Sequence, residues 1–359
     1  MFCKLFCDHH NFMSTTSHLI LGIETSCDET AAAVYQTGFG VRSSLLFTQI
    51  ELHRPYGGVM PEVASRSHIE KIHLIVEQAL SNASTTLAEI DAIAVATGPG
   101  LPGSLLVGSC FAKALAYESK KPLIAVNHIE AHVFSPLIEN TTVPFPHLCL
   151  TASGGHTALF YVEDFGKYSR IGTTLDDSAG EAFDKVAKLI GLSYPGGPLI
   201  EQLARQEHFK DSLHYPRLKK KSLNFSFSGL KTAVLYDLIE RGAFDLKTKT
   251  FLATDDPTLI RMVASSFLVC VGDIFVDRIA HALTLFPDCK AITFAGGVSC
   301  NRYLNDRIAQ IAHNHRISFF SPAKHYCTDN AAMVAFVGSF KMQQGCFSPL
   351  SVDIKPQGD

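Results

Sequence analysis

The chain has 359 residues, of which 47% are hydrophobic and 18% are charged. This composition excludes an intrinsically disordered polypeptide, and the length predicts two lobes of ordinary domain size. Lys and Arg number 31 against 34 Asp and Glu, for a formal net charge of −3, so nothing global indicates nucleic-acid binding. An RNA partner would need a helper protein or a local basic patch, for which Arg217 and Lys219–Lys221 are the candidate, although the same residues are equally typical of a solvated surface loop.

The compartment can be inferred from the cysteines and from the apolar segments. Ten cysteines are scattered without a C-x-x-C pair, which favours a reducing, cytoplasmic compartment over a disulfide framework. Residues 1–17 resemble neither a secretory signal nor a transit peptide; we expect a disordered N-terminal tail, with Met13 as an alternative start. No membrane association is expected, because the nearest candidate span, Ala92–Phe111, is interrupted by Gly98-Pro99-Gly100 and Pro102-Gly103.

Strand-like and helix-like segments alternate along the chain, which predicts an α/β protein. A strand at His18–Ile23, a polar turn and a returning strand at Thr30–Tyr35 form one hairpin. The same arrangement recurs at His147–Thr151 and Thr157–Val162. We infer two similar lobes, each opening with a hairpin whose turn faces a shared cleft.

The remaining predicted elements divide between these lobes. The expected boundaries are a first lobe at 18–145, joined by a C-terminal helix near 330–345, and a second lobe at 146–329. In the first lobe we expect an amphipathic helix at Glu62–Leu80 with Ile69 on its apolar stripe, a strand at Asp91–Thr97, a helix ending near Tyr117 and a strand at Pro122–Val126. After residue 145 we expect a helix at Ser178–Ile190, a rigid loop at Tyr194–Pro198, an irregular segment at Phe209–Thr232 and a long apolar helix at Pro257–Thr284. A strand at Ala291–Phe294, a loop at Ser321–Thr328 and a last helix at Asp329–Lys341 follow.

Two histidines, His128 and His132, are four residues apart. On a helix this spacing puts both imidazoles on one face, about 40° apart around the axis, where they can bind one metal ion. Two histidines that share a face for structural reasons give the same pattern. Asp329 is the candidate third ligand, although Asp before an apolar helix is also a normal N-cap. This donor set leaves coordination positions open, and iron(II) and zinc both fit it.

The HIEAH sequence at 128–132 differs from the H-E-x-x-H motif of zinc metallopeptidases. In that motif the Glu directly follows the first His and reaches the metal-bound water. Glu130 instead lies two residues after His128, about 200° around a helix. We therefore expect Glu130 to point away from the imidazoles as a solvent or salt-bridge residue, which disfavours a peptidase.

Glycine-rich turns follow two of the predicted strands and favour nucleotide binding. The turn Ser153-Gly154-Gly155 lets backbone N–H groups approach a phosphate, although it is also typical of an ordinary hairpin. Gly296-Gly297 can lie against a flat base, with Asn301 able to bind its edge or the ribose. Neither is a G-x-G-x-x-G or Walker motif, which disfavours a dinucleotide enzyme and a P-loop ATPase.

Four carboxylates and a glycine complete the predicted site. Asp184 lies on an otherwise apolar helical face, where it can bind both ribose hydroxyls or form a surface ion pair. Gly197 would let its loop lie against that sugar, with Glu201 one turn beyond. Asp28 and Glu29 lie in the first hairpin turn and can handle a proton, bind a second cation or act only as turn residues; Glu29 is our candidate for proton handling.

Nine motifs, taken together, resemble the TsaD family of bacterial tRNA N6-adenosine threonylcarbamoyltransferases. They occur in the family's order, from residue 23 to residue 333, and nine in order are highly specific. They are IETSCDET (23–30), GPGLPGS (98–104), NHIEAH (127–132), SGGHT (153–157), GEAFDKVAK (180–188), PGGP (195–198), FSFSGLKTA (225–233), AGGVSCN (295–301) and TDNAAM (328–333).

The resemblance implies an actin-like fold, shared with sugar kinases and heat-shock ATPases, with two similar lobes around a nucleotide cleft. It implies His128, His132 and Asp329 as ligands of one divalent metal ion, with iron(II) preferred and zinc as the alternative. The residues that match the family's substrate contacts are the phosphate-binding hairpin Thr151, Ala152, Ser153, Gly154 and Gly155, the nucleoside contacts Asp184, Gly197 and Asn301, and Glu201, at a position that is only sometimes a carboxylate in the family.

The implied reaction is a metal-assisted acyl transfer. The threonylcarbamoyl group would pass from L-threonylcarbamoyladenylate to N6 of the adenosine next to the anticodon, in tRNAs that read codons beginning with A, and AMP would leave. The resemblance also implies TsaB-like and TsaE-like partner proteins and a cytoplasmic location.

Three rival functions remain open from the sequence: a nucleotide-binding regulatory or chaperone-like module of the same fold, a metallopeptidase, and a scaffold that only holds a partner. The paired histidines with Asp329 count against the first, and the position of Glu130 counts against the second.

Overall fold

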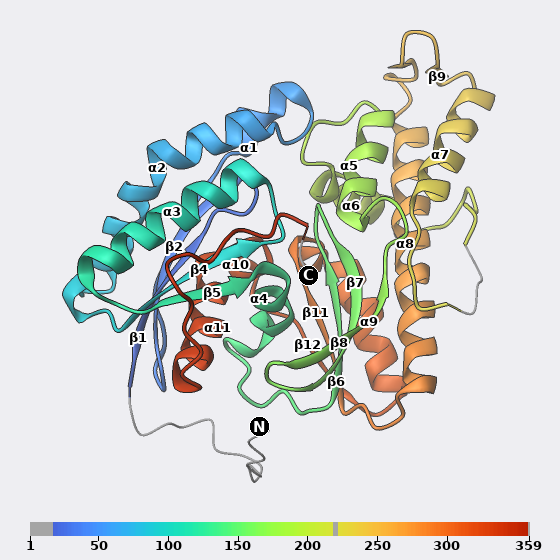
Figure 1. Cartoon of the computed structure of the whole chain (residues 1–359). Helices are drawn as coiled ribbons and strands as arrows, with labels where there is room; N and C mark the ends of the chain where they lie inside the picture. The colour runs from blue at the N-terminus through green and yellow to red at the C-terminus, as the bar shows by residue number, and fades with distance from the viewer. Residues whose placement is uncertain (1–16, 218–221, 358–359) are drawn as a thin grey trace.

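The computed structural model describes residues 17–217 and 222–357 of the chain. The predicted tail at 1–17 therefore lies almost entirely outside the described residues, as do Met13 and Lys219–Lys221. Two five-stranded sheets stand side by side, each covered by helices (Figure 1).

The first sheet has the strand order β3-β2-β1-β4-β5, in which β1, β2 and β3 are antiparallel and β4 and β5 run parallel to β1. Helices α2 and α3 cover one of its faces, and α11 packs against β1, β2 and β4. Its strands and helices are β1 (Leu19–Glu24), β2 (Glu29–Gln36), β3 (Gly40–Thr48), α1 (Ile50–His53), α2 (Pro61–Asn82), β4 (Ala92–Gly98), α3 (Pro102–Ser119), β5 (Leu123–Asn127), α4 (His128–Phe134) and α11 (Ala331–Gln343).

The second sheet repeats this topology in the order β12-β11-β6-β7-β8. Strands β6, β7 and β8 are antiparallel, and β11 and β12 run parallel to β6. Its elements are β6 (His147–Ala152), β7 (Thr157–Asp164), β8 (Lys167–Thr173), α5 (Ala179–Leu189), α6 (Gly196–Gln206), α7 (Ser228–Glu240), β9 (Phe244–Asp245), β10 (Thr250–Phe251), α8 (Pro257–Leu285), β11 (Ala291–Ala295), α9 (Arg302–Asn314), β12 (Ser318–Phe320) and α10 (Lys324–Cys327). The inferred repeat of two hairpin-led lobes is thus confirmed.

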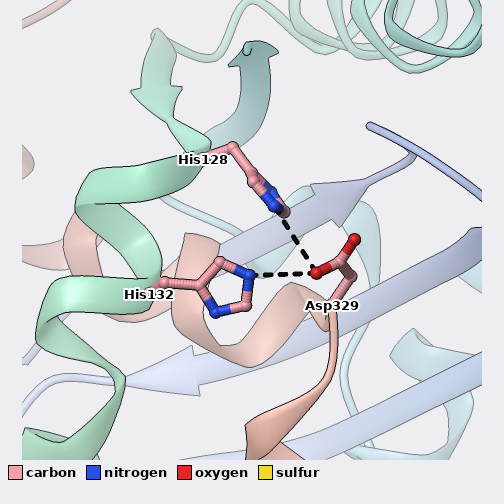
Figure 2. A group of neighbouring side chains, drawn as sticks. All are labelled: His128, His132 and Asp329. Carbon is pink, nitrogen blue, oxygen red and sulfur yellow. Dashed lines mark hydrogen bonds and ion pairs between the residues drawn. The ribbon is translucent and has the colours of Figure 1, made fainter. Parts of the chain in front are cut away.

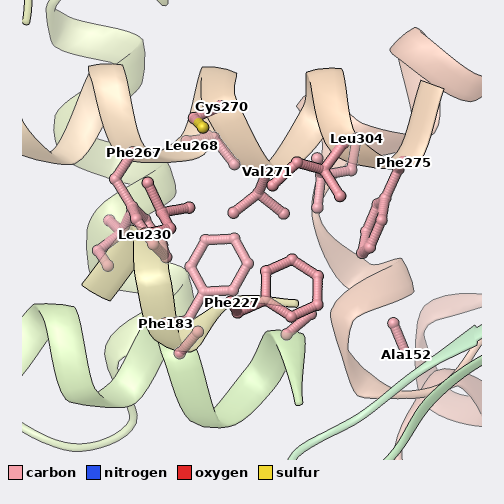
Figure 3. Packing of buried hydrophobic residues seen from close by; sticks show 14 of the residues in the cluster. Ala152, Phe183, Phe227, Leu230, Phe267, Leu268, Cys270, Val271, Phe275 and Leu304 are labelled. Carbon is pink, nitrogen blue, oxygen red and sulfur yellow. The ribbon is translucent and has the colours of Figure 1, made fainter. Parts of the chain in front are cut away.

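The core of the second lobe is built around α8. Phe267, Val271 and Phe275 project from this helix onto Phe183 of α5 and Phe227 (Figure 3). By length and composition α8 could cross a membrane, which the sequence analysis overlooked, but 67% of its most apolar window is buried inside the protein. An apolar helix buried to this degree is the core helix of a globular lobe.

Several predicted boundaries were wrong, for local reasons. Only the first part of the rigid loop predicted at Tyr194–Pro198 is non-helical, because α6 begins at Gly196 with Pro195 as its N-cap. Pro198 is tolerated in the first turn, where its missing N–H would have no intrahelical acceptor. The predicted loop at Ser321–Thr328 contains the short helix α10. Ile69 was assigned to the apolar stripe of α2 but is 64% exposed.

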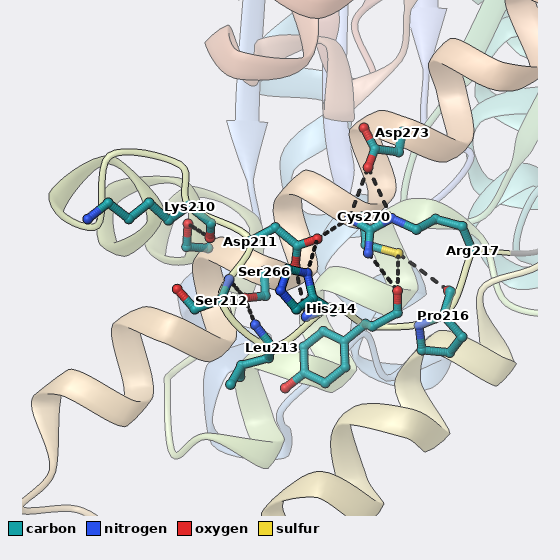
Figure 4. Close-up of polar contacts among 12 residues, drawn as sticks. Lys210, Asp211, Ser212, Leu213, His214, Pro216, Arg217, Ser266, Cys270 and Asp273 are labelled. Carbon is teal, nitrogen blue, oxygen red and sulfur yellow. Dashed lines mark hydrogen bonds and ion pairs between the residues drawn. The ribbon is translucent and has the colours of Figure 1, made fainter.

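The irregular segment predicted at Phe209–Thr232 extends too far, because α7 begins at Ser228. Its first part is bound to α8 (Figure 4). Ser266 of α8 accepts hydrogen bonds from the backbone of Ser212 and Leu213 through its Oγ. Arg217, assigned to the candidate basic patch, pairs with Asp273 at 2.9 Å and with Asp211 at 2.6 Å. Because both partners are carboxylates of this chain, Arg217 already has its charge neutralised locally.

Candidate active site

A cleft of about 1030 Å³ opens between the two lobes. Hairpin turns and helix ends from both sheets line it, including the β1–β2 turn and the β6–β7 turn. Of the predicted site residues, those that line the cleft are Asp28, Glu29, His128, Ser153, Gly154, Gly155, Asp184, Gly197, Glu201, Asn301 and Asp329.

Two histidines of α4 and one aspartate face one another at the edge of this cleft (Figure 2). Helix α4 starts immediately after β5, and the side chain of Asn127 caps it by accepting hydrogen bonds from the N–H groups of Ile129 and Glu130. Both imidazoles therefore lie on one face, as predicted. Asp329 Oδ1 lies 2.9 Å from His132 Nε2 and 3.5 Å from His128 Nε2.

The N-cap role considered for Asp329 belongs to its neighbour. Helix α11 begins at Ala331, and Asn330 Oδ1 accepts a hydrogen bond from Met333 N–H at 3.0 Å. Because Asn330 caps the helix, the carboxylate of Asp329 is left to face the histidines.

The charged forms of Asp329 and His128 are stabilised by neighbouring groups of opposite charge. Burial favours the neutral form of Asp329, but the two imidazoles outweigh it and hold the pKa of this carboxyl well below its usual range. Burial likewise opposes a charge on His128, yet Asp329 and Glu24 raise its pKa well above the usual range. The two buried imidazoles and the partly buried carboxylate thus bring three metal-ligand groups together.

The spacing fits a metal ion. Ligand atoms at about 2.1 Å from a metal lie roughly 3.0–3.4 Å from one another in octahedral or tetrahedral sites. The two Nε2–Oδ1 distances, 2.9 and 3.5 Å, lie close to that range. On its far side, His128 Nδ1 contacts Glu24 Oε2 at 2.9 Å and Ser26 Oγ at 3.1 Å, the kind of contact that orients a ligating imidazole.

Glu24 and Ser26 were not singled out by the sequence analysis. Glu24 is fully buried at the end of β1, where a charged residue directly follows the apolar run Leu19–Ile23. A buried carboxylate needs a partner, and that position could have marked it as a functional candidate.

Glu130 points away from the imidazoles, as expected. Its Oε2 lies 2.8 Å from Lys341 Nζ of α11, and the residue is only 8% exposed. This carboxylate is thus half of an ion pair between two helices and is not available as a general base.

The β6–β7 turn reaches the cleft through only part of the predicted hairpin. The side chains of Thr151 and Ala152 are buried in β6, and Ala152 belongs to the core (Figure 3). Ser153 N–H is used within the turn itself, where it donates to His156 O at 2.8 Å. Among the described residues, the N–H groups of Gly154 and Gly155 have no acceptor within the chain, so these two can donate to an anion.

Asp184 and Gly197 lie together beside this turn. Asp184 Oδ1 accepts a hydrogen bond from Gly196 N–H at 2.7 Å, while burial raises the pKa of this carboxyl to about 6. A Cβ added to Gly197 would meet nothing within 4 Å, so the backbone here is open to a ligand.

Glu201 and Asn301 are tied to the start of α9. Glu201 Oε1 accepts from Arg302 N–H at 3.0 Å, and Asn301 Oδ1 caps the helix by accepting from Leu304 N–H at 3.0 Å. Because its carbonyl oxygen is engaged, Asn301 can offer a ligand chiefly its amide N–H groups.

Across the cleft, Asp28 and Glu29 lie at the β1–β2 turn. Burial, followed by the charges of Asp28 and Asp329, raises the pKa of Glu29 well above its usual range. A carboxylate with a raised pKa accepts a proton more readily than an exposed one when it is ionised.

Comparison with known proteins gives the same family as the motifs. The family described as TsaD, tRNA N6-adenosine threonylcarbamoyltransferase, matches residues 40–336. A protein of that name from Caldicellulosiruptor saccharolyticus is 44% identical over 338 residues, covering 94% of this chain and 97% of its own. One from Bartonella bacilliformis is 45% identical, covering 94% and 93%.

Solved structures agree on the fold at low sequence identity. HypF from T. kodakarensis has a TM-score of 0.59 at 13% identity, covering 91% of this chain and 48% of its own. Component A of (R)-2-hydroxyglutaryl-CoA dehydratase from Acidaminococcus fermentans has a TM-score of 0.51 at 12% identity, covering 91% and 99%. The fold is therefore of the actin-like ATPase and sugar-kinase type, and the chain, a transferase, belongs to the TsaD family of tRNA N6-adenosine threonylcarbamoyltransferases.

Proposed function

We propose that this chain transfers the threonylcarbamoyl group of L-threonylcarbamoyladenylate to N6 of the adenosine next to the anticodon, in tRNAs that read codons beginning with A. The observation that carries the proposal is that His128, Asp329 and Asp184 line one cleft together with the Gly154–Gly155 turn, and that His132 contacts Asp329. The reaction takes place in the cytoplasm, with TsaB-like and TsaE-like proteins as partners.

Two features of the second lobe would hold the adenylate. The N–H groups of Gly154 and Gly155 donate to its phosphate, and the remaining lone pairs of the Asp184 carboxylate accept from the ribose hydroxyls. Backbone donors at the phosphate also stabilise the negative charge that AMP acquires on leaving.

His128, His132 and Asp329 would hold one divalent metal ion, iron(II) by preference and zinc as the alternative. When bound, the ion supplies Lewis-acid polarisation of the threonylcarbamoyl oxygens. The adenine N6 attacks the carbamoyl carbonyl carbon, a C–N bond forms, and the bond from that carbon to the phosphate oxygen breaks. The proton released from N6 passes to Glu29, so no side chain becomes a covalent nucleophile.

The test is an in-vitro transfer assay. The purified chain, its partners, threonylcarbamoyladenylate and unmodified tRNA are combined, and the nucleosides are analysed by mass spectrometry. We expect modified adenosine from wild type, a loss of at least about 100-fold in His132→Ala, and retained transfer in Glu130→Ala, which removes a carboxylate outside the cleft. No product from a folded, metal-loaded wild type with competent partners would refute the transferase assignment for this chain, and loss in Glu130→Ala without unfolding would favour a peptidase-like role.

A further inference from the structure

His68 of α2 is fully buried behind the cleft, where it contacts the turn that carries Asp28 and Glu29. Its Nε2 lies 2.9 Å from the backbone oxygen of Cys27, and its Nδ1 lies 2.8 Å from Thr30 Oγ1. The two ring nitrogens therefore contact the turn on both sides of the cleft-lining pair.

These contacts fix the tautomer of His68. A backbone carbonyl can only accept, so Nε2 carries the proton, and Nδ1 accepts from the Thr30 hydroxyl. Burial lowers the pKa of His68, which agrees with a neutral ring. Gln49 Nε2, at 3.4 Å from Nδ1, is a second donor to the same nitrogen.

The carbonyl of Cys27 is held by two donors from different helices. Ser104 Oγ of α3 also donates to it, at 3.1 Å. The next carbonyl, that of Asp28, accepts from Gln49 N–H at 3.1 Å. These hydrogen bonds hold the backbone of Cys27 and Asp28 against α2, α3 and Gln49, and the side chains of Asp28 and Glu29 line the cleft from this held segment.

We propose that His68 is a positioning residue for the transfer reaction: its Nε2–H fixes the Cys27–Asp28 peptide and thereby the placement of Asp28 and Glu29 in the cleft. His68 is separated from the cleft by the turn itself and touches no substrate. The inference rests on the proposed function, and it adds a residue that the family's motif near the metal does not contain.

Two substitutions separate this role from simple packing. The amide nitrogen of Gln lies as many bonds from Cα as His Nε2 does, so His68→Gln can keep the donor to Cys27. The amide of Asn corresponds to Nδ1, so His68→Asn keeps the contact to Thr30 and loses the one to Cys27. His73→Gln and His73→Asn, on the same helix at a side chain that is 75% exposed, are the matched controls.

The measurement is kcat and KM for tRNA in the full transfer assay, with thermal unfolding of each variant beside it. We expect His68→Asn to lower kcat about tenfold with little change in KM, the rate loss that corresponds to one hydrogen bond holding the reacting geometry. His68→Gln is expected within about threefold of wild type, and both His73 variants should match wild type.

Ser104→Ala is an independent test, because it does not require that the His68 variants fold. This substitution removes the second donor to the Cys27 carbonyl and is expected to lower kcat, as His68→Asn does. In the double variant, the two effects on kcat should not be additive, because both act through the same carbonyl. Equal kcat for His68→Asn and His68→Gln, whether both high or both low, would overturn the inference, as would an unaffected Ser104→Ala. An inactive wild type would instead refute the proposed function, so the two failures are distinguishable.

Discussion

Asp184 illustrates at the scale of one residue how burial sets the chemistry of the cleft. Within the described part of the chain its carboxyl accepts one hydrogen bond, from Gly196 N–H, and burial outweighs that bond to raise its pKa to about 6. The ionised form, which can accept from two ribose hydroxyls, is therefore lost on mild acidification.

This residue predicts a pH-dependent affinity for AMP. Above pH 6 Asp184 is ionised and accepts from the ribose; below it the neutral acid is a poorer acceptor, so affinity should fall as pH decreases from 7 to 5. Isothermal titration of the wild type should show the decrease, and Asp184→Asn should bind AMP weakly and with a flatter pH dependence over that range. A wild-type affinity that does not change between pH 7 and 5 would contradict the assignment.

The same shift has a consequence for folding. Because the folded pKa of Asp184 lies above its ordinary value of 3.8, the ionised carboxylate is disfavoured in the folded state. Its burial thus costs stability above pH 6, and that cost disappears as pH falls toward 4.

At the scale of an element, the start of α11 decides which polar side chain enters the site. Asn330 caps the helix through Oδ1 and donates through Nδ2 to Thr328 O at 2.7 Å and Tyr326 O at 3.1 Å. One amide thus fixes both the helix and the loop that carries Asp329.

The substitution Asn330→Asp separates these two roles. Aspartate keeps the cap acceptor but loses both donors to the loop, and it adds a charge next to Asp329. We expect a loss of roughly 1–3 kcal/mol in unfolding free energy, because the buried Tyr326 carbonyl and the more exposed Thr328 carbonyl are left without donors. Metal affinity, measured by competition with a chelator, should also fall, because Asp329 is held less firmly.

The control for this prediction is Asn314→Asp, on the exposed last residue of α9, which does not line the cleft. It should change neither property beyond about 0.5 kcal/mol, as expected for a surface substitution. If Asn330→Asp is measurably destabilised but keeps its metal affinity, the Asn330 amide does not position Asp329 for the metal, and the prediction is wrong.

At the scale of the whole molecule, the two lobes repeat one topology and place their hairpin turns across a shared cleft. The β1–β2 turn contributes carboxylates, and the β6–β7 turn contributes free backbone N–H groups. A nucleotide bound in the cleft, as proposed, would contact two turns that are more than one hundred residues apart in sequence.

Ligand binding should accordingly stabilise the folded chain. At a concentration of AMP 100 times its Kd, linkage predicts about 2.7 kcal/mol, an upward shift of a few degrees in Tm for a chain of this size. Differential scanning fluorimetry measures it, with adenine-free ribose 5-phosphate as the control ligand, which should give a smaller shift. No shift at millimolar AMP would argue against a nucleotide in this cleft.

Much of this organisation could be predicted from sequence because it rests on local periodicity. The strands at β1 and β6, the helix at α8 and the shared face of His128 and His132 all follow from spacing within one element. Gly197 was wrongly placed in a loop although it lies in the first turn of α6, and Ile69 was wrongly placed on an apolar stripe. The alternative that Asp329 caps α11 was left open by the sequence, and the structure gives that role to Asn330.

The sequence by itself determined the fold class and the hairpin repeat, because these depend on hydrophobic period and turn chemistry, and its ordered motifs supplied the candidate site residues. Only the tertiary structure decided that Asp329 meets both histidines, that Glu24 and Ser26 stand behind His128, and that His68 holds the Cys27 carbonyl. These contacts join residues from 41 to about two hundred positions apart, and such pairs are selected by the packing of the helices against the sheets rather than by any local pattern.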